Sequence, residues 1–275
     1  MESISEFELV TRTALQALER GETIALATVV QVRGSAPRHA GARMLVWPDG
    51  HIAGTIGGAT LEERVIQHAQ EALDNHRGRL EKYVFSTTGD SDSVGLCGGE
   101  VLVHIEVLEP DPVLVVIGAG HVALALAQAA PIAGMRVVIV DDRAEFLTPD
   151  RFPMADRLIP VKYERDTEQL DPMSLNLTPS SYVVVATWGW DEPALAQILR
   201  ADPPPAYVSL IASKTKWRVI QQMLVAQGID AQRLDSVHAP AGLNLGAETP
   251  GEIAIAIIAE MMAVRRKVNA ASMKL

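Results

Sequence analysis

The stretch Val113-Leu-Val-Val-Ile-Gly-Ala-Gly-His-Val-Ala123 decides the fold of the second half of this 275-residue chain. Its apolar start predicts a buried strand, and a helix is expected to open at His121, directly after the glycines. Gly118 permits the tight turn, Gly120 lets the backbone approach a pyrophosphate, and Ala123 is small enough for helix-on-strand packing. Free N–H groups and the helix dipole favour an anion there. The stretch therefore predicts a nucleotide or pyrophosphate site formed by Gly118, Ala119, Gly120, His121 and Val122.

Acidic residues lie at the end of the second strand, where a dinucleotide-binding site is expected to bind a ribose. The next strand ends at Asp141, 21 residues after Gly120, where a carboxylate is expected to bond a ribose 2′-hydroxyl. Asp142 adds a negative charge that disfavours a 2′-phosphate, whereas Arg143 weakens that inference. Asp141, Asp142 and Arg143 are therefore candidate cofactor-binding residues. The alternative is a degenerate domain in which the glycines only pack, and His121 could equally be structural.

The remainder of this half alternates strand and helix patterns. Strands of pure Val, Ile and Leu character indicate burial on both faces, which is typical of a parallel sheet. The expected elements are strands at 113–117, 136–140, 158–161, 182–186 and 207–211, and helices at 121–131, 193–199, 214–227 and 250–267. The pattern predicts an α/β, Rossmann-like doubly wound parallel sheet. The apolar stripe of the last helix is expected to pack in the core, and part of it could form a dimer face.

The first half predicts a smaller mixed α+β domain. Helices are expected at 6–19 and 60–76, and strands at 24–32, 42–47, 51–53, around 83–85 and at 100–108. Ser5 and Glu8 have the spacing of a capping box before the first helix. The segment 109–112, Glu-Pro-Asp-Pro, reads as a stiff linker, which gives an N-terminal domain at 1–109 and a C-terminal domain at 113–275.

Composition excludes several classes of protein. The formal net charge is −10, so the mean field repels the phosphates of nucleic acid and of anionic lipid. One cysteine allows no internal disulfide, and the acidic N-terminus lacks the features of a signal peptide. The apolar region 113–140 is divided by glycines, a proline and polar residues, so no membrane helix is expected there. We expect a cytoplasmic protein with neither nucleic acid nor membrane as a partner.

Glycine loops of the first half form a second group of candidates. Gly57, Gly58, Gly98 and Gly99 could form anion-binding nests facing the second domain, or could be ordinary turn residues. Arg33, Arg38 and Arg43 surround a Gly-Ser-Ala-Pro loop. These arginines could neutralise a phosphate, or could be solvated surface charges.

The single cysteine, Cys97, lies in a polar loop beside glycines. A thiolate is a soft ligand that suits molybdenum or the carriage of a sulfane sulfur, so Cys97 is a candidate catalytic and metal-binding residue. The alternative is a small residue that fills a gap in the packing. The histidines form no paired pattern, so no zinc site is predicted. His238 could reach a ligand, although a local hydrogen bond is slightly favoured.

Long strings along nearly the whole chain resemble the XdhC/CoxI family. In the first half these are the segments 26–38 and 41–46, together with Gly54-Thr-Ile-Gly-Gly58 and Gly95-Leu-Cys-Gly-Gly-Glu100. In the second half they are 116–123, 140–143, 148–153 and 238–254. The chain departs from the family at Ala59 and Thr60, where a glycine and a cysteine are common, and in the strings 187–191 and 212–216.

The resemblance implies a maturation chaperone of xanthine dehydrogenase-type molybdoenzymes. Such a protein binds the molybdenum cofactor, a molybdopterin, protects it during sulfuration and delivers it to the apo-molybdoenzyme. The partners implied are that apo-enzyme, a cysteine desulfurase and a second copy of the chain in a homo-oligomer. The first alternative is an NAD(P)-dependent oxidoreductase that uses His121 or Asp191 in proton transfer. A second alternative is a nucleotide-binding regulatory module.

Overall fold

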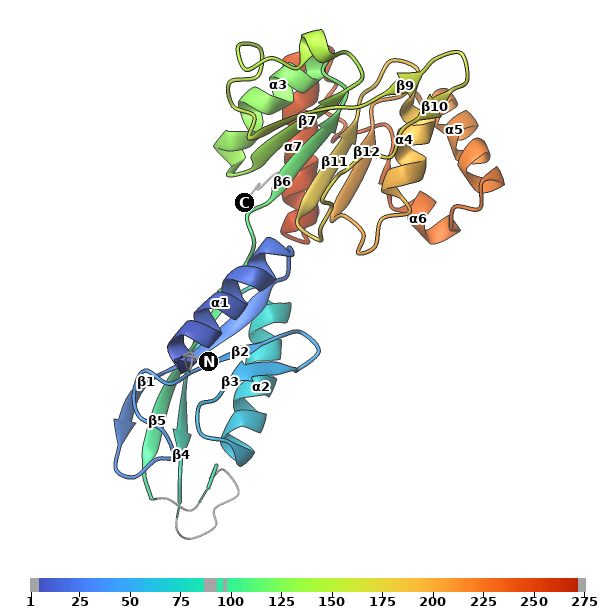
Figure 1. The fold of residues 1–275 in the computed structure, drawn as a ribbon. Coiled ribbons are helices and arrows are strands. Elements are labelled where there is room, and N and C mark those ends of the chain that lie inside the picture. The colour runs from blue at the N-terminus through green and yellow to red at the C-terminus, as the bar shows by residue number, and fades with distance from the viewer. Residues whose placement is uncertain (1–4, 87–92, 96–97, 272–275) are drawn as a thin grey trace. The chain divides into compact units, whose positions relative to one another are not determined.

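The computed structural model describes residues 5–86, 93–95 and 98–271. The chain folds as two compact units, residues 1–110 and 111–275 (Figure 1). Each unit has its own hydrophobic cores, because no buried cluster combines side chains from both. Among the described residues, no helix is both long and apolar enough to cross a membrane.

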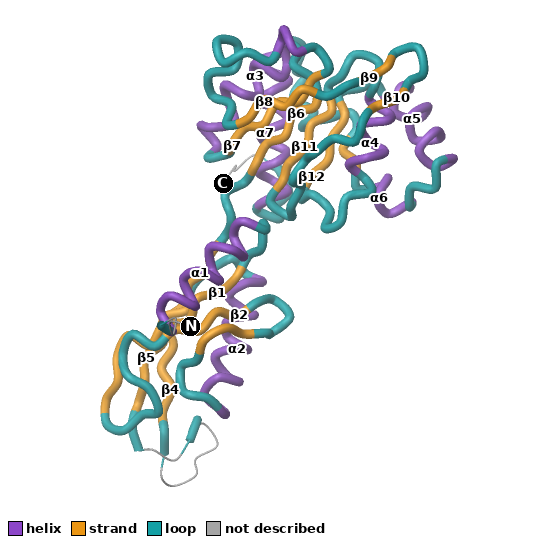
Figure 2. Tube along the Cα trace, viewed as in Figure 1, coloured by secondary structure: helices purple, strands orange, loops and turns teal. Residues whose placement is uncertain are grey.

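The N-terminal unit is an antiparallel sheet covered on both faces (Figure 2). Its strand order is β3-β2-β1-β5-β4, and each neighbouring pair is antiparallel. Helix α1 (Glu6–Glu19) packs against one face and helix α2 (Ala59–Asp74) against the other. The strands are β1 (Ile24–Arg33), β2 (Arg43–Val46), β3 (Ile52–Gly54), β4 (Arg79–Val84) and β5 (Glu100–Leu108).

The C-terminal unit contains a six-stranded sheet in which all neighbouring strands are parallel. The strands are β6 (Val113–Ile117), β7 (Arg136–Asp141), β8 (Arg157–Pro160), β11 (Ser181–Val185), β12 (Tyr207–Leu210) and β13 (Val237–His238). Their order, β13-β12-β11-β6-β7-β8, is the 3-2-1-4-5-6 order of dinucleotide-binding domains read from the other edge. The direction of winding reverses between β6 and β11, which is where such sheets bind ligands.

Helices cover both faces of this sheet because its central strands, β6 and β11, are buried at nearly every position (Figure 1). Leu114 and Val116 of β6 face α3 (His121–Ala129) and α7 (Pro250–Arg265). Val115 and Ile117 face the other layer. That layer consists of α4 (Asp191–Ile198), α5 (Lys214–Ala226) and the short α6 (Ala231–Asp235). The predicted fold class, a doubly wound parallel sheet preceded by an α+β part, is confirmed.

The differences from the predicted elements lie in short segments. The helix expected at 121–131 ends at Ala129 and continues as a 3-10 turn, η1 (Ala130–Ala133). Pro131 lacks an N–H group and cannot continue the helical hydrogen bonding. The elements that the sequence pattern did not reveal are α6, β13, η2 (Ala144–Phe146) and the hairpin of β9 (Tyr163–Glu164) and β10 (Gln169–Leu170). Two-residue strands carry too little periodicity to be recognised.

Candidate functional site

The glycine turn after β6 lies at the point where the sheet reverses its winding. Gly118 is buried with a φ of +111°, and a Cβ added to it would lie 2.3 Å from the carbonyl oxygen of Ala186, just after β11. Its N–H donates to the carbonyl of Val140 in β7 at 2.6 Å. The turn therefore touches the ends of both neighbouring strands, and only glycine fits at position 118.

The buried carboxylate of Asp141 holds the turn through a hydrogen bond. Its side chain is 1% exposed and accepts hydrogen bonds from the N–H of Ala119, from the N–H of Arg143 and from the Arg143 guanidinium at 2.8 and 2.9 Å. Burial by itself raises the pKa of Asp141, but the bonds from Arg143 and Ala119 outweigh it and hold the pKa below its ordinary value. Both carboxylate oxygens are thus used within the protein. The contact with a ribose stays a prediction.

The start of α3 is open to a ligand. Gly120 is the N-cap residue, no described side chain caps the helix, and its first turn contains no acidic residue. By contrast, the side chains of Ser5, Ser213, Asp230 and Thr249 cap four other helices. A Cβ added to Gly120 would meet nothing within 4 Å, and His121 is exposed. The first N–H groups of α3 therefore have no side-chain cap among the described residues, and helix starts of this kind favour anions.

The loop after β11 contributes an exposed aromatic ring. Trp188 is 76% exposed, while the neighbouring Trp190 is buried and donates its indole N–H to Asp142 at 3.2 Å. Arg165 bonds the carbonyl of Trp188 and the Asp142 carboxylate, at 3.2 and 3.0 Å, and its guanidinium lies 5.5 Å from the Trp188 ring. Trp188 thus projects from a loop whose backbone is held in place.

An ion pair between a buried carboxylate and an exposed lysine supports the same loop. Asp191, 3% exposed, accepts from the N–H and the hydroxyl of Thr187 at 3.1 and 2.7 Å, and it pairs with Lys216 of α5. Thr187 follows β11, and its nitrogen would lie 3.2 Å from a Cβ at Gly118. The sequence pattern indicated no role for Lys216, and it suggested Asp191 only for proton transfer.

Arg151 is a further cation beside the turn that the sequence pattern did not single out. Its guanidinium donates to the carbonyl of Ala119 at 3.2 Å and lies 5.0 Å from the centre of the Phe146 ring. Its Nε is buried and has no hydrogen-bond partner within the described part of the chain. Arg143 is paired with Asp141 and lies near Asp142, so Arg151 is the additional cation beside the turn.

The nest predicted at Gly57 and Gly58 exists, and it holds a carboxylate of the protein itself. Glu62 accepts, on one oxygen, from the N–H groups of Ile56, Gly57 and Gly58 at 3.1, 3.3 and 2.9 Å and from the Thr55 hydroxyl. Burial raises the pKa of Glu62, but these bonds outweigh it and lower the pKa below the ordinary value. The anion that this nest binds in the structure is therefore internal.

The other N-terminal candidates divide between packing and ion pairing. A Cβ on Gly99 would lie 2.3 Å from the carbonyl oxygen of Ser35, so the glycine is needed for close backbone packing; Gly98 is exposed. Arg33 pairs with Glu100 at 3.3 Å. Cys97 lies outside the described residues. Within the described ranges, no group of three or more His, Cys, Asp or Glu side chains is placed to hold a metal ion.

His238 makes the local contact that the sequence favoured. Its Nδ1 lies 3.2 Å from a carboxylate oxygen of Glu260, and its ring is 4.6 Å from that of Tyr207. The Tyr207 hydroxyl donates to the same carboxylate, and burial followed by this bond raises the pKa of Tyr207. His238 is therefore part of the packing between β13 and α7.

Known proteins of related sequence share both units. A family model described as the XdhC Rossmann domain matches residues 114–261, and one described as the XdhC and CoxI family matches residues 17–84. YqeB of Escherichia coli K12 is 38% identical over 249 residues, which cover 90% of this chain and 44% of YqeB. The chain therefore spans less than half the length of that relative.

Two further relatives have names that describe a function. A probable xanthine dehydrogenase subunit of Bacillus subtilis 168 is 25% identical over 334 residues, covering 93% of this chain and 98% of that protein. The molybdenum cofactor insertion chaperone PaoD of Escherichia coli K12 is 32% identical over 109 residues, covering 39% of this chain and 34% of PaoD.

Proposed function

Because this chain belongs to the XdhC and CoxI family, we propose that it binds the molybdenum cofactor and assists its insertion into a xanthine dehydrogenase-type molybdoenzyme. The names of two relatives, a cofactor insertion chaperone and a xanthine dehydrogenase subunit, support this role. The structural observation that carries the proposal is the uncapped start of α3 at the winding reversal of the sheet.

The residues at this position fit the phosphorylated tail of a pterin cofactor. Gly120, His121 and Val122 offer backbone N–H groups at a helix start, and Gly120 leaves open space beside them. Gly118 and Ala119 form the turn. Asp141 accepts a hydrogen bond from Ala119, and Arg143 in turn donates to Asp141. Asp142 fixes the neighbouring loop through Trp190. When bound, the cofactor supplies molybdenum chemistry, and the chain's own residues bind and orient its tail.

Cys97 concerns a more specific part of this proposal, namely sulfuration of the cofactor and ligation of molybdenum. It is the sole cysteine, so any sulfur transfer or thiolate ligation of molybdenum by a protein thiol depends on it. Sulfuration would bring a cysteine desulfurase to the chain as a partner, and delivery would bring the apo-molybdoenzyme. Replacement of Cys97 by alanine tests both ideas, through molybdenum content and through activation of a client enzyme.

The decisive experiment compares two glycines at helix starts. Gly120→Ala places a methyl group where the phosphate would approach, whereas Gly251→Ala places one in open space at the start of α7. We expect the first variant to co-purify with about tenfold less molybdenum and pterin, because the methyl group would hold the phosphate away from the N–H groups and weaken roughly one charge-assisted hydrogen bond. Gly251→Ala should keep the wild-type content, as measured by metal analysis and native mass spectrometry. Equal loading of both variants would contradict the proposed site.

An NAD(P)-dependent oxidoreductase is the second candidate, and the strand order favours it, since this order is shared with dinucleotide-binding domains. His121 is exposed beside the turn and could exchange a proton with a substrate. Asp191 is already tied to Lys216 and Thr187, which opposes a role as a base. A fluorescence titration with NADH separates the candidates, because absence of saturable binding at millimolar concentration rules out the oxidoreductase.

A further inference from the structure

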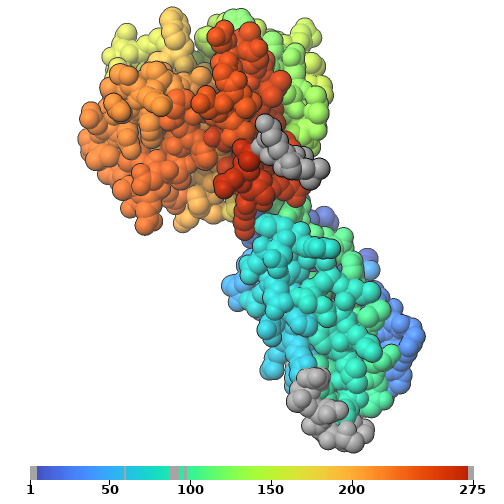
Figure 3. All heavy atoms as spheres, turned by 180° about the vertical axis from the view of Figure 1, so that it is seen from behind, coloured from blue at the N-terminus to red at the C-terminus, as the bar shows by residue number. Residues whose placement is uncertain are grey.

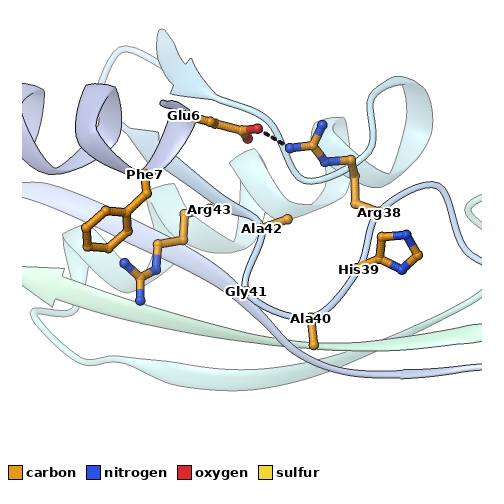
Figure 4. Close-up of a pocket in the computed structure, with 8 residues that line it drawn as sticks. All are labelled: Glu6, Phe7, Arg38, His39, Ala40, Gly41, Ala42 and Arg43. Atoms are coloured by element: carbon orange, nitrogen blue, oxygen red, sulfur yellow. Dashed lines mark hydrogen bonds and ion pairs between the residues drawn. The ribbon is translucent and has the colours of Figure 1, made fainter. Parts of the chain in front are cut away.

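A pocket lined by two arginines opens on the N-terminal unit, and none of its lining residues belongs to the glycine turn. Its volume is about 230 Å³, and it is lined by Glu6 and Phe7 at the start of α1 and by the loop segment 38–43 before β2 (Figure 4). All of its walls belong to one unit. The sequence predicted Arg33, Arg38 and Arg43 together, and the structure brings only the last two to this pocket.

The charges of the lining are not balanced. Arg38 forms an ion pair with Glu6, which Figure 4 marks with a dashed line. Arg43 lies 4.9 Å from the centre of the Phe7 ring, and its Nε is buried without a hydrogen-bond partner among the described residues. His39 adds an exposed imidazole. Arg38 thus has a carboxylate partner, whereas Arg43 has none among the described residues, so an anion in the pocket would meet a guanidinium without a counter-ion.

The start of α1 adjoins the pocket. Glu6 and Phe7 lie in the first turn of the 14-residue α1, which Ser5 caps and which carries the acidic residues Glu6 and Glu8, so the charge that an entering anion has to displace is that of Glu6. The chain as a whole carries −10 and repels anions at long range. The positive charge is local to this pocket. It would therefore bind an anion at close range without attracting anions to the rest of the surface.

We propose that this pocket is a phosphate-binding site of the N-terminal unit, with Glu6 as an internal counter-ion that the ligand displaces from Arg38. Arg38 and Arg43 both line the pocket, and guanidinium groups bind the oxygens of a phosphate through paired, charge-assisted hydrogen bonds. Both side chains of the ion pair, 36% and 38% exposed, are free to reach solvent when it opens.

The test titrates inorganic phosphate into the intact chain at constant pH and ionic strength. The imidazole C–H resonance of His39, assigned through His39→Gln, reports on the pocket, and that of His121 reports separately on the glycine turn. We expect a saturable shift of His39 in the wild type. Glu6→Gln removes the competing charge and should tighten binding about two- to fivefold. Arg38→Gln should weaken it about tenfold or more.

Glu8→Gln is the matched control, because it removes the same charge from the same helix turn at a residue that pairs with Arg12 outside the pocket. Equal effects of Glu6→Gln and Glu8→Gln, or no shift of His39, would overturn the proposal. Tighter binding cannot result from misfolding, so Glu6→Gln keeps the test valid even if Arg38→Gln unfolds. Malonate binding as tightly as phosphate would overturn the assignment of phosphate. A shift of His121 alone would support the glycine turn and reject this pocket.

Discussion

Gly118 and Gly120 are separated by one alanine, yet the surrounding structure makes different demands on them. At Gly118 the backbone has a φ of +111° and a Cβ would collide with Ala186. At Gly120 the φ is −75° and a Cβ would meet open space. The first glycine is therefore required for folding, and the second is free to serve a ligand.

Alanine substitutions at these two positions should separate stability from binding. Gly118→Ala is expected to lower the free energy of unfolding by about 3 kcal/mol or more, through backbone strain and the collision with Ala186. Gly120→Ala should change it by no more than about 0.5 kcal/mol. Chemical unfolding followed by circular dichroism measures both values. Similar losses in the two variants would mean that position 120 is also structural.

At the scale of the element, the start of α2 shows how a glycine loop can bind an anion without a ligand. The segment 55–58 presents successive N–H groups, and Glu62 from the first turn of the same helix fills the position of the anion. The carboxylate also lies at the positive end of the helix dipole, which stabilises its charged form. At the start of α3 the internal carboxylate of Asp141 accepts only from the N–H of Ala119, before the helix, and no described side chain caps the helix itself, which separates it from the self-satisfied nest of α2.

The Glu62 nest predicts a specific dependence of stability on pH. Glu62→Gln keeps an acceptor but removes the charge, so we expect a loss of about 1 to 2 kcal/mol at pH 7. Because the folded pKa is below the ordinary value of 4.5, the contribution of the carboxylate is present above that value and disappears as the pH falls through the folded pKa. The difference between wild type and variant should therefore shrink in acid.

Unfolding curves at pH 7 and at about pH 4 measure this difference, within the usual range of carboxyl titration. The exposed neighbour Glu63 provides the control, since Glu63→Gln changes the net charge equally on the same helix turn. A difference that stays constant with pH, or an equal effect of Glu63→Gln, would show that the nest does not stabilise the charged carboxylate.

At the scale of the whole molecule, the two units bury separate cores. The two clusters of the C-terminal unit use only residues from Val113 onward, and those of the N-terminal unit use none beyond Leu108. We expect a fragment of residues 111–275 to fold alone with one cooperative unfolding transition and native helix content. Circular dichroism and amide NMR dispersion test this. A disordered fragment would refute the independence of the domains.

Helix α7 carries the surface that we propose for self-association (Figure 3, in red). Ile255 and Met262 are 60% and 53% exposed and lie seven residues apart, on the same face of the helix. If the chain forms a dimer through this face, Ile255→Asp should convert it to a monomer in sedimentation velocity. Val219→Asp, which places the same charge on an exposed apolar residue of α5, serves as the control. A monomeric wild type would end the proposal.

The sequence by itself determined the fold class and the place of the glycine turn. Unbroken Val and Ile runs demand burial on both faces, and the glycines before His121 demand a turn, so both features depend on neighbouring residues only. Even the Glu62 nest was within reach, because its donors and acceptor lie within seven residues. The short α6 and β13 could not be predicted because they contain too few residues to show a hydrophobic periodicity.

Only the tertiary structure decided which side chains surround the site. Arg165 reaches Asp142 across 23 residues, Lys216 reaches Asp191 across 25, and Arg151 reaches Ala119 across 32. These contacts follow from the order of the strands in the sheet. The hydrophobic pattern of the sequence carries no information on which strand lies beside which. For the same reason the sequence pattern predicted a ligand contact for Asp141 but not its hydrogen bonds to Ala119 and Arg143, which only the packed structure shows.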